Sequence, residues 1–478
     1  MSRILMVSSE AAPYAKTGGL ADVAGALPAA LQRLGHEVTT LIPRYAALQT
    51  TPSRRVWDAL PVWLAGISYP TSLFAPDDGS PVLFLDCPPL YNRPDLYGDR
   101  TGDYPDNAVR FAVLSRAALE VARHVFRPNL IHCHDWQTGL VPVYLKTTFA
   151  NDPTFFDIRT LFTIHNLGYQ GIFASSALGQ IGLGADLFRP DRMEFFGDIS
   201  FLKAGLVFSD AISTVSPRYA EEIQTPEYGN GLDGLLRERR ADLTGILNGV
   251  DYSHWNPETD HFLAANYSPK KLDGKKTCKR ELLREFGLPG TAMDRPLIGI
   301  VSRLTGQKGA DLIAEVAGPL FKEDISLVVL GSGEPRFESV FRHIAQANPN
   351  RAGLFLGYND GLAHRIEAGS DMFLMPSRYE PCGLNQIYSL RYGTVPIVRA
   401  TGGLDDTIEE GTGFKFREYS GEALLQAIRD ACRAYRKRGS WTETMRLGMA
   451  KDFSWDASAS QYSELYGRLL NPGRQRSI

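Results

Sequence analysis

The sequence contains few cysteines, and their spacing pairs none of them. Only five occur in 478 residues, and no Cys-x-x-Cys segment is present. An odd number at irregular intervals argues against a disulfide framework and against a zinc ribbon. We therefore expect a reduced, cytoplasmic protein. The five are Cys87, Cys133, Cys278, Cys382 and Cys432.

Long apolar runs are also missing. The first ten residues, MSRILMVSSE, hold too short an apolar run for a signal peptide and reach Glu10 at once. No later stretch approaches the length that a membrane span requires. We expect no membrane partner.

The chain has no excess of one charge. Its 51 Lys and Arg residues nearly balance its 54 Asp and Glu residues, which leaves a net charge of −3. The basic residues are scattered, so the sequence does not indicate binding to nucleic acid or to an anionic membrane. A neutral or small anionic substrate fits this composition better.

Three phosphate-related motifs are missing where they would matter. The first strand–helix turn carries neither a P-loop nor G-x-G-x-x-G, and GSGEPR from Gly331 lacks the third glycine. This weakens the case for a nicotinamide-dependent oxidoreductase. Asp-x-Asp, which commonly holds a divalent ion against a sugar-nucleotide diphosphate, occurs nowhere in the sequence. We expect no metal in the reaction.

What the sequence does have is a regular alternation of short apolar runs and amphipathic helical patterns. A helix is expected at 20–34, with Gly35 as its C-terminal cap. Strand–helix repetition with continuous Val, Ile and Leu runs is typical of parallel sheets covered on both faces. The polar stretch 252–279 is interpreted as surface. Strands are predicted at 3–9, 36–43, 82–86, 129–134, 159–165 and 211–216, and then at 296–302, 325–331, 352–357, 371–376 and 394–399.

A glycine-paired turn occurs twice. KTGGLAD begins at Lys16, and ATGGLDD begins at Ala400. In doubly wound sheets, ligands bind at the loops that leave the carboxyl ends of the strands, where glycine lets the backbone approach a phosphate. Two such turns could serve one ligand between two domains. Alternatively, the Gly-Gly pair occurs twice by chance, because it is a common turn dipeptide.

Two further loops carry charge that could act on a substrate. The segment IVSRLTGQKG places Arg303 and Lys308 after a predicted strand, where two cations can clamp a diphosphate and neutralise it as it leaves. The segment SRYEPCGL places Glu380 at a strand end, where a carboxylate can stabilise positive charge on a sugar ring. The alternatives are a solvated basic loop and an acidic helix start.

The histidines allow a metal site or a polar one. The segment HCHD holds His132, His134 and Asp135 at a strand end, and TIHNLGYQG holds His165. No further Cys or His lies at the usual ligand spacing, so we favour hydrogen bonding to a polyol over metal binding. Asp135 and His165 are the two residues expected to face a ligand.

Together these segments resemble the ADP-glucose-dependent glycogen synthases of bacteria and the starch synthases of plants. The resemblance covers nearly the whole chain and rests on the order of its motifs. These are SSEAAPYAKTGGLADVAGALP, HDWQTGL, TIHNLGYQG, ILNGVD, SRLTGQKG and SRYEPCGLNQIYSLRYGTVPIVRATGGLDDT.

The resemblance implies an α/β protein of the GT-B fold, with two Rossmann-like domains of doubly wound parallel sheet facing each other across a deep cleft. The first would span 1–243 and carry the acceptor side, and the second would span 244–455 and bind the nucleotide sugar. The terminal helix, 456–478, would cross back onto the first domain. The implied reaction transfers glucose from ADP-glucose to the non-reducing end of an α-1,4-glucan such as glycogen, with retention of configuration and without a cofactor.

The same resemblance implies the roles of individual residues. Glu380, Lys308, Arg303, His165 and Asp135 would be catalytic. Lys16 and the glycine loops would approach the diphosphate, Asp22 and Tyr358 would lie near the nucleoside, and Tyr91 would lie near the sugar. The implied substrate-binding set is Lys16, Gly18, Gly19, Asp22, Tyr91, Asn248, Tyr358, Cys382, Gly383, Leu384, Thr401, Gly402 and Gly403.

At one position the chain differs from many retaining GT-B enzymes, and this difference narrows the resemblance to one family. Many retaining GT-B enzymes carry a second Glu eight positions after the first, whereas Tyr388 stands there in this chain. Glycogen and starch synthases share that difference. The alternatives are a related transferase with another donor or acceptor, and a binding protein without catalysis. The preference for ADP over UDP rests on the resemblance, and the oligomeric state stays open.

Overall fold

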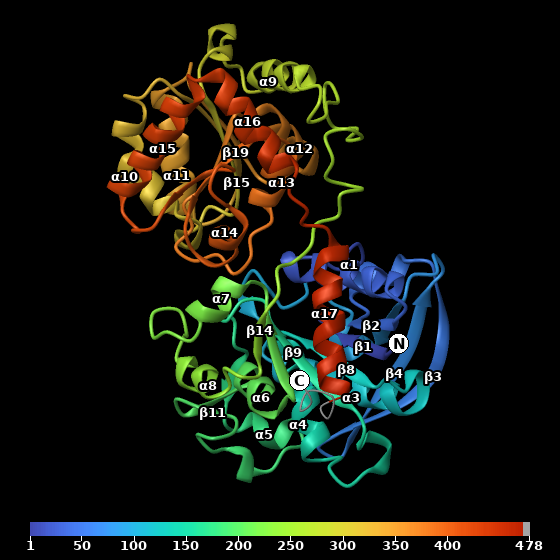
Figure 1. The fold of residues 1–478 in the computed structure, drawn as a ribbon. Coiled ribbons are helices and arrows are strands. Elements are labelled where there is room, and N and C mark those ends of the chain that lie inside the picture. The colour runs from blue at the N-terminus through green and yellow to red at the C-terminus, as the bar shows by residue number, and fades with distance from the viewer. Residues whose placement is uncertain (472–478) are drawn as a thin grey trace, which may run out of the picture. The chain divides into compact units, whose positions relative to one another are not determined.

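The computed structural model describes residues 1–471, which divide into two compact units (Figure 1). Unit 1 comprises residues 1–215, 220–249 and the segment from Trp455 onward, and unit 2 comprises 216–219 and 250–454. The sequence analysis had set the boundary at 243/244, and the chain changes unit after Gly249. Each unit is built around its own sheet.

Unit 1 contains a nine-stranded sheet in the order β14-β13-β9-β8-β1-β2-β5-β4-β3. All pairs from β14 to β5 are parallel, and the last two pairs are antiparallel. The strands are β1 (Arg3–Val7), β2 (Glu37–Pro43), β3 (Ser53–Leu64), β4 (Ile67–Pro76), β5 (Val82–Asp86), β8 (Leu130–His134), β9 (Arg159–Ile164), β13 (Ala211–Thr214) and β14 (Leu243–Gly245). Shorter strands are β6 (Gly98–Asp99), β7 (Gly102–Asp103), β10 (Ile172–Ala174), β11 (Glu194–Phe195) and β12 (Asp198–Ser200).

The helices of unit 1 cover both faces of this sheet. Leu161 of β9 faces a core shared with α1 and α17, whereas its neighbour Phe162 lies against Gly205 of α6. Successive strand residues point to opposite faces, so one strand contributes to two cores. The helices are α1 (Gly19–Arg33), α2 (Pro88–Tyr91), α3 (Asn107–Val121), α4 (Leu140–Lys146), α5 (Ala177–Gln180), α6 (Phe201–Phe208), α8 (Asp233–Glu238) and α17 (Trp455–Leu470). Helix α7 (Pro217–Glu222) begins in the unit 2 segment 216–219 and ends in unit 1.

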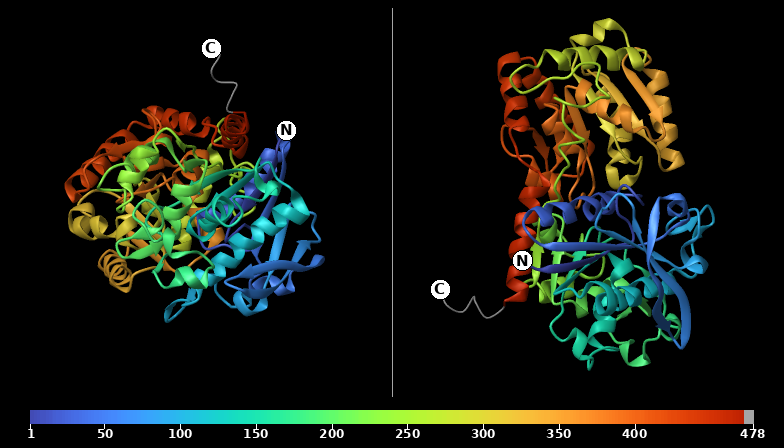
Figure 2. Two further views of the ribbon diagram at one scale, coloured as in Figure 1. Left: turned by 90° about the horizontal axis from the view of Figure 1, so that it is seen from below. Right: turned by 90° about the vertical axis from the view of Figure 1, so that its right-hand side faces the viewer.

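The antiparallel edge of this sheet was not predicted. β3 and β4 form a long hairpin beside β5, drawn in blue in Figures 1 and 2. Over 53–59 the side chains of β3 are exposed or half-buried on both faces, so the strand lacks a hydrophobic alternation there. Its register also shifts twice, between Arg55 and Trp57 and between Trp57 and Leu60. The sequence pattern therefore carries little signal for this strand.

Unit 2 contains a six-stranded parallel sheet in the order β17-β16-β15-β18-β19-β20. Five of its strands were predicted, and only the short edge strand β20 was missed. The strands are β15 (Leu297–Val301), β16 (Ser326–Gly331), β17 (Ala352–Leu356), β18 (Met372–Met375), β19 (Val395–Arg399) and β20 (Phe414–Phe416).

Two separate cores flank the unit 2 sheet. Leu327 and Val329 of β16 face α10, α11 and α15, whereas Val328 and Leu330 face α9 and α12. Helices therefore cover both faces, as the continuous apolar strands predicted (Figure 1). The helices are α9 (Asp273–Glu285), α10 (Ala310–Leu320), α11 (Pro335–Ala347), α12 (Asp360–Gly369), α13 (Asn385–Arg391), α14 (Gly402–Thr407), α15 (Gly421–Tyr435) and α16 (Arg438–Met449).

The interpretation of 252–279 as surface was wrong in part. Tyr267 and Cys278 belong to a buried cluster with Tyr392. Lys275 is buried too, and its Nζ donates to the carbonyl of Ala368 at 2.9 Å and to other oxygens. Polar composition concealed this burial because each buried polar group is satisfied by a partner far away in the sequence.

Among residues 1–471, no helix is both long enough and apolar enough to cross a membrane.

Helix α17 completes one core of unit 1 from the other end of the chain. Trp455, Ala459 and Tyr462 pack with residues of α1 and of five strands, β1, β2, β8, β9 and β13. At the far end, the Tyr466 hydroxyl hydrogen-bonds His132 Nδ1 at 2.9 Å, and both side chains are fully buried. This polar contact fixes α17 against β8.

Replacing Tyr466→Phe should lower the free energy of unfolding by about 1–3 kcal/mol, because a buried ring nitrogen of His132 loses its partner. Urea denaturation followed by circular dichroism measures the change. Glu464→Ala, at an exposed position of the same helix, is the matched control. Equal stability of the two variants would contradict the anchoring role of this hydrogen bond.

Candidate active site

A buried carboxylate, that of Glu10, accepts hydrogen bonds from the first glycine loop of unit 1. Glu10, which is 3% exposed, accepts hydrogen bonds from the Thr17 backbone N–H and from the Thr17 hydroxyl, at 2.5 and 2.7 Å. The Tyr97 hydroxyl donates to the same carboxylate at 2.5 Å. Beside it, exposed Lys16 pairs with Asp22 at 2.6 Å. The sequence analysis missed Glu10 and Tyr97, although Glu10 lies within the SSEAAPYAKTGG segment.

Gly18 and Gly19 leave open space at the start of α1. A Cβ built on either would meet no atom within 4 Å. Gly18 has an extended backbone, with φ −162°, so its conformation does not require glycine. What the missing side chains provide is access to the first N–H groups of α1, a 15-residue helix, and such groups attract anions.

Asp135 combines a strained backbone with a buried carboxyl group. It follows β8 with φ 56° and ψ −178°, a region that is essentially restricted to glycine and costs about 1–3 kcal/mol. Burial raises the pKa of this carboxyl to about 7, although backbone N–H groups of His165 and Asn166 oppose the shift. The His165 N–H donates to Oδ1 at 2.7 Å. Strain and an elevated pKa at one residue are typical of a functional position.

His165, which follows β9, is kept uncharged. Burial lowers its pKa to about 3, and its Nε2 hydrogen-bonds His134 Nδ1 at 3.0 Å. His134 is also buried, and its own Nε2 has no hydrogen-bond partner. Neutral imidazoles next to Asp135 can donate and accept hydrogen bonds, as sugar hydroxyls require.

His132 has a structural role. Both of its ring nitrogens are bonded, to the hydroxyl of Tyr466 and to that of Thr163 at 2.9 and 2.6 Å. It therefore has no lone pair left for a metal, and the His-x-His segment does not form a metal site.

Asn248 has a polar atom without a protein partner that a ligand could contact, whereas the side chain of Tyr91 is buried and hydrogen-bonded. Asn248, which follows β14, is 6% exposed, and its Oδ1 has no partner. A buried unpaired oxygen is unusual in a native protein and favours a ligand contact. Tyr91 is fully buried, and its hydroxyl donates to the Arg110 carbonyl at 2.7 Å. Its buried ring has no exposed surface to offer a sugar in this structure.

In unit 2, Lys308 and Glu380 form an ion pair. Lys308 Nζ donates to Glu380 Oε2 at 2.6 Å, and the Ser377 hydroxyl donates to the same oxygen at 3.0 Å. Glu380 is 5% exposed, and the lysine side chain is 21% exposed. The structure thus brings together a cation and a carboxylate that lie 72 residues apart. Glu380 Oε1 has no hydrogen bond described in the structure.

The loop of Lys308 is shaped by Gly309 and flanked by Arg303. Gly309 has φ 77°, and a Cβ on it would lie 2.1 Å from the Pro376 carbonyl oxygen, so only glycine fits. Arg303 is exposed, and its guanidinium donates to Gln307 at 3.2 Å. Arg303 therefore adds a second cation to the loop that carries Lys308.

The second glycine pair is packed tightly, unlike the first. A Cβ on Gly402 would lie 2.0 Å from the Glu380 carbonyl oxygen, and one on Gly403 would lie 2.0 Å from that of Cys382. The Gly403 N–H also donates to the Glu380 carbonyl at 3.2 Å. Gly402 and Gly403 therefore hold the backbone of the Glu380 loop in place. Thr401 and Cys382, the neighbours of these glycines in sequence or in space, are buried. Gly383 and Leu384, just before α13, are half-buried.

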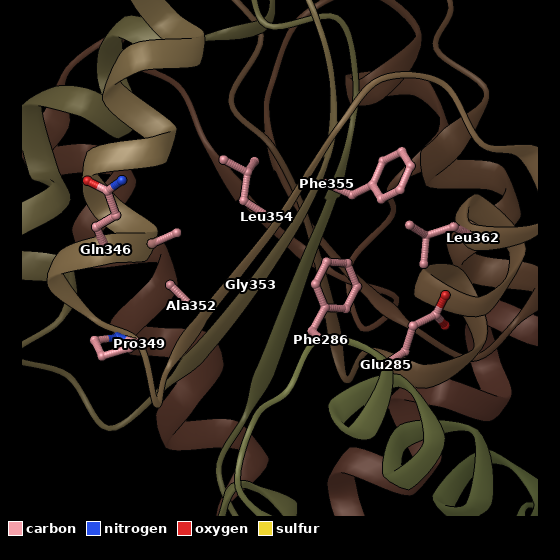
Figure 3. Close-up of a pocket in the computed structure, with 10 residues that line it drawn as sticks. Glu285, Phe286, Gln346, Pro349, Ala352, Gly353, Leu354, Phe355 and Leu362 are labelled. Carbon is pink, nitrogen blue, oxygen red and sulfur yellow. The ribbon is translucent and has the colours of Figure 1, made fainter.

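Tyr358 lies between β17 and α12, and the residue is 84% exposed. Its hydroxyl donates to Asp360 Oδ1 at 3.3 Å. A pocket of about 420 Å³ opens elsewhere in unit 2, along edge strand β17 (Figure 3). Phe286, Leu354 and Leu362 are among the residues that line it, and none of the predicted site residues does.

A glycine-rich pattern and a group of potential metal ligands lie outside the predicted site. The pattern G-x-G-x-x-G does occur, at 229–234, but it follows α7 rather than a strand, so it is not a dinucleotide fingerprint. Within residues 1–471, one group of three side chains has the spacing to hold a metal ion, namely His254, Asp360 and His364. The sequence analysis did not identify this group.

The elevated pKa of Asp135 makes a testable contribution to stability. The folded-state pKa, about 7, exceeds the ordinary value of 3.8, so the protonated carboxyl stabilises the fold at low pH. That contribution is lost as the pH rises through 7. Between pH 5 and 7, wild type should therefore lose about 1.4 kcal/mol per pH unit relative to Asp135→Asn.

Urea denaturation at several pH values measures this difference. Asp157→Asn, at an exposed position of the same unit, is the control. Its free energy of unfolding should vary with pH as that of wild type does. If the free energies of unfolding of wild type and Asp135→Asn change equally between pH 5 and 7, Asp135 does not titrate in this pH range.

Comparison with known proteins places this geometry in a family. Residues 3–238 match the starch synthase catalytic domain, and residues 285–447 match the glycosyl transferases group 1 family. The glycogen synthase of Koribacter versatilis (strain Ellin345) is 50% identical over 472 residues, which cover 97% of both chains. That of Myxococcus xanthus (strain DK1622) is 50% identical over 477 residues, covering 98% of this chain and 99% of the other.

Solved structures agree with these matches. The catalytic domain of starch synthase IV from Arabidopsis thaliana, bound to ADP and acarbose, superposes with a TM-score of 0.89 at 36% identity. It covers 98% of this chain and 99% of that one. Sucrose-phosphate synthase from Thermosynechococcus elongatus shares the fold, with a TM-score of 0.62 at 19% identity. The fold class is GT-B, with two Rossmann-like α/β units, and the chain belongs to the glycogen and starch synthase family of glycosyltransferases.

Proposed function

We propose that the protein transfers glucose from ADP-glucose to the non-reducing end of an α-1,4-glucan, with retention at the anomeric carbon. The observation that carries this proposal is the ion pair between Lys308 and Glu380, at 2.6 Å in a largely buried setting. It provides a cation for the departing phosphate and a carboxylate for the sugar. The relatives named above, and the ADP and acarbose bound to the Arabidopsis enzyme, support the choice of substrates.

The reaction breaks the bond between the anomeric carbon and the phosphate oxygen of the donor. A new bond forms from that carbon to the 4-hydroxyl oxygen of the acceptor glucan. The proton of this hydroxyl leaves with the departing ADP, so charge and atoms balance. Positive charge grows on the sugar ring and negative charge grows on the diphosphate before the new bond is complete, and catalysis must stabilise both.

Unit 2 supplies the groups that respond to these charges. Lys308 and Arg303 neutralise the diphosphate as it leaves, and Glu380 acts on the developing positive charge of the ring. Glu380 also orients Lys308 before the donor binds, so little reorganisation is required during the reaction. Fixed charges of this kind act strongly in a site from which water is excluded.

Unit 1 supplies hydrogen-bonding groups for the sugars and one cation, Lys16, for the phosphates. The neutral imidazole of His165, the carboxyl group of Asp135 and the unpaired Oδ1 of Asn248 are suited to binding sugar hydroxyls. We assign Lys16, Gly18 and Gly19 to the donor phosphates, because their loop offers a cation and open backbone N–H groups.

The nucleoside is assigned to the loop of Tyr358. This residue is 84% exposed, and stacking of its ring on a nucleobase would cover apolar surface. Parallel assays of glucose incorporation into glycogen with ADP-glucose and UDP-glucose test the donor. Faster incorporation from UDP-glucose, with the same acceptor, would contradict the proposed donor.

We also propose a cytoplasmic location. The five cysteines are all buried, and none forms a disulfide. Reduced, buried thiols are typical of proteins that work in a reducing compartment.

Two substitutions test the ion pair. Glu380→Gln should bind ADP-glucose nearly normally and lose roughly a hundredfold or more in kcat, because its charge acts on the transition state. Lys308→Ala should lower kcat far more than it raises KM, for the same reason. Initial-rate kinetics with ADP-glucose and glycogen measure both.

The matched controls come from a surface ion pair of the same unit, between Lys451 and Glu409. Lys451→Ala and Glu409→Gln remove the same charges away from the proposed chemistry and should retain wild-type kinetics. Wild-type kcat in Glu380→Gln would leave Glu380 as a structural residue of its loop, and an inactive wild type that still binds ADP-glucose would indicate a binding protein.

We further propose that the reaction needs no metal ion. The sequence has no Asp-x-Asp to hold a cation against the diphosphate, and Arg303 and Lys308 supply the positive charge instead. Excess EDTA should leave the rate with ADP-glucose essentially unchanged at 25 °C. Loss of activity in EDTA that magnesium restores would overturn the roles given to Arg303 and Lys308.

A further inference from the structure

Three potential metal ligands of unit 2 converge next to the loop of Tyr358, and none of them is among the groups assigned to the reaction. Asp360 and His364 lie four residues apart on α12, so their side chains share one face of that helix. His254 reaches the same place from a turn that follows β14, and its Nε2 lies 3.7 Å from Asp360 Oδ2. One ligand atom from each of the three lies within 4.8 Å of the others.

The ring of His364 is oriented as in a metal-binding histidine. Its Nδ1 donates to Asp260 Oδ2 at 2.7 Å, and both side chains are buried. The Tyr392 hydroxyl donates to the same carboxylate oxygen at 2.6 Å, which fixes the position of Asp260. A carboxylate that accepts from Nδ1–H fixes the tautomer and leaves the Nε2 lone pair for a ligand.

His364 Nε2 has no hydrogen-bond partner, although the residue is completely buried. A buried imidazole nitrogen without a partner is costly and requires an explanation. A metal ion bound to Nε2 would satisfy this nitrogen. No protein group does so in the described structure, and the exposed His254 and half-buried Asp360 leave the ion a route from solvent.

The surroundings hold these ligands in position before any ion binds. The Trp255 ring stacks on His364, with centroids 3.7 Å apart and planes 10° apart. The turn that carries His254 is closed by backbone bonds from His254 and Trp255 to the Asp251 carbonyl, at 3.2 and 3.0 Å.

We propose that His254, Asp360 and His364 form a binding site for a zinc-class divalent ion. Two imidazole nitrogens and one carboxylate oxygen favour Zn²⁺, Co²⁺ or Ni²⁺ over Mg²⁺ and Ca²⁺, which prefer all-oxygen sites. With bonds of about 2.0 Å, a tetrahedral ion takes three protein ligands and one water. It joins the 251–260 segment to α12 and stabilises unit 2.

The proposal is independent of the transfer reaction, so it is tested without ADP-glucose. Chelator-treated, desalted protein is dialysed against Zn²⁺, and bound metal is counted by mass spectrometry. Wild type should bind one Zn²⁺ per chain at this site. His254→Ala should weaken binding at least about tenfold, since even losing a partner of a metal ligand costs that much. Because His254 is exposed, the variant should fold normally.

His343→Ala is the matched control, since His343 is an exposed histidine of the same unit, on α11. It should bind Zn²⁺ like wild type. Co²⁺ provides a second measurement: the visible absorption of a tetrahedral complex should form with wild type and with His343→Ala but not with His254→Ala.

Thermal unfolding supplies a third measurement. Saturating Zn²⁺ should raise the Tm of wild type and of His343→Ala, and should have no such effect on His254→Ala. The proposal is overturned if His254→Ala binds Zn²⁺ as tightly as wild type, or if His343→Ala loses as much affinity as His254→Ala does.

Discussion

The direction of the strands in the two parallel sheets determines where the chemistry can lie. Because neighbouring strands run the same way, the loops that follow them leave each sheet along one edge. Every proposed reactive group occupies such a loop. In unit 1, Lys16 follows β1, Asp135 follows β8, His165 follows β9 and Asn248 follows β14; in unit 2, Arg303 and Lys308 follow β15, Tyr358 follows β17, Glu380 follows β18 and Thr401 follows β19.

This constraint explains how much could be predicted from sequence. Continuous apolar runs identified all the long parallel strands, and the charged or glycine-rich segments after them supplied most residues of the proposed site. Two kinds of feature could not be found in that way. Strand β3 is exposed along its first half and so lacks a hydrophobic period. Buried polar groups such as Glu10 and Asp260 depend on partners far along the chain, and local composition does not reveal those partners.

The two glycine pairs show that one sequence pattern can satisfy two different requirements. Gly18 and Gly19 border open space, and their lack of side chains exposes backbone N–H groups. Gly402 and Gly403 border the carbonyl groups of Glu380 and Cys382, where no side chain fits. The first pair concerns access for a ligand, and the second concerns the placement of a carboxylate. The repeated letters are the same in both loops, but the packing around each pair shows that the glycines are needed for different reasons.

The place of α17 in unit 1 has a consequence for biosynthesis. The apolar face formed by Ile4, Met6 and Leu27 is completed by Trp455, which the ribosome adds some 430 residues later. During translation this face of the first sheet stays uncovered while all of unit 2 is made. A nascent chain in that state exposes an apolar surface that chaperones bind and that promotes aggregation. Synthesis must therefore pass Tyr466 before the first unit can finish folding.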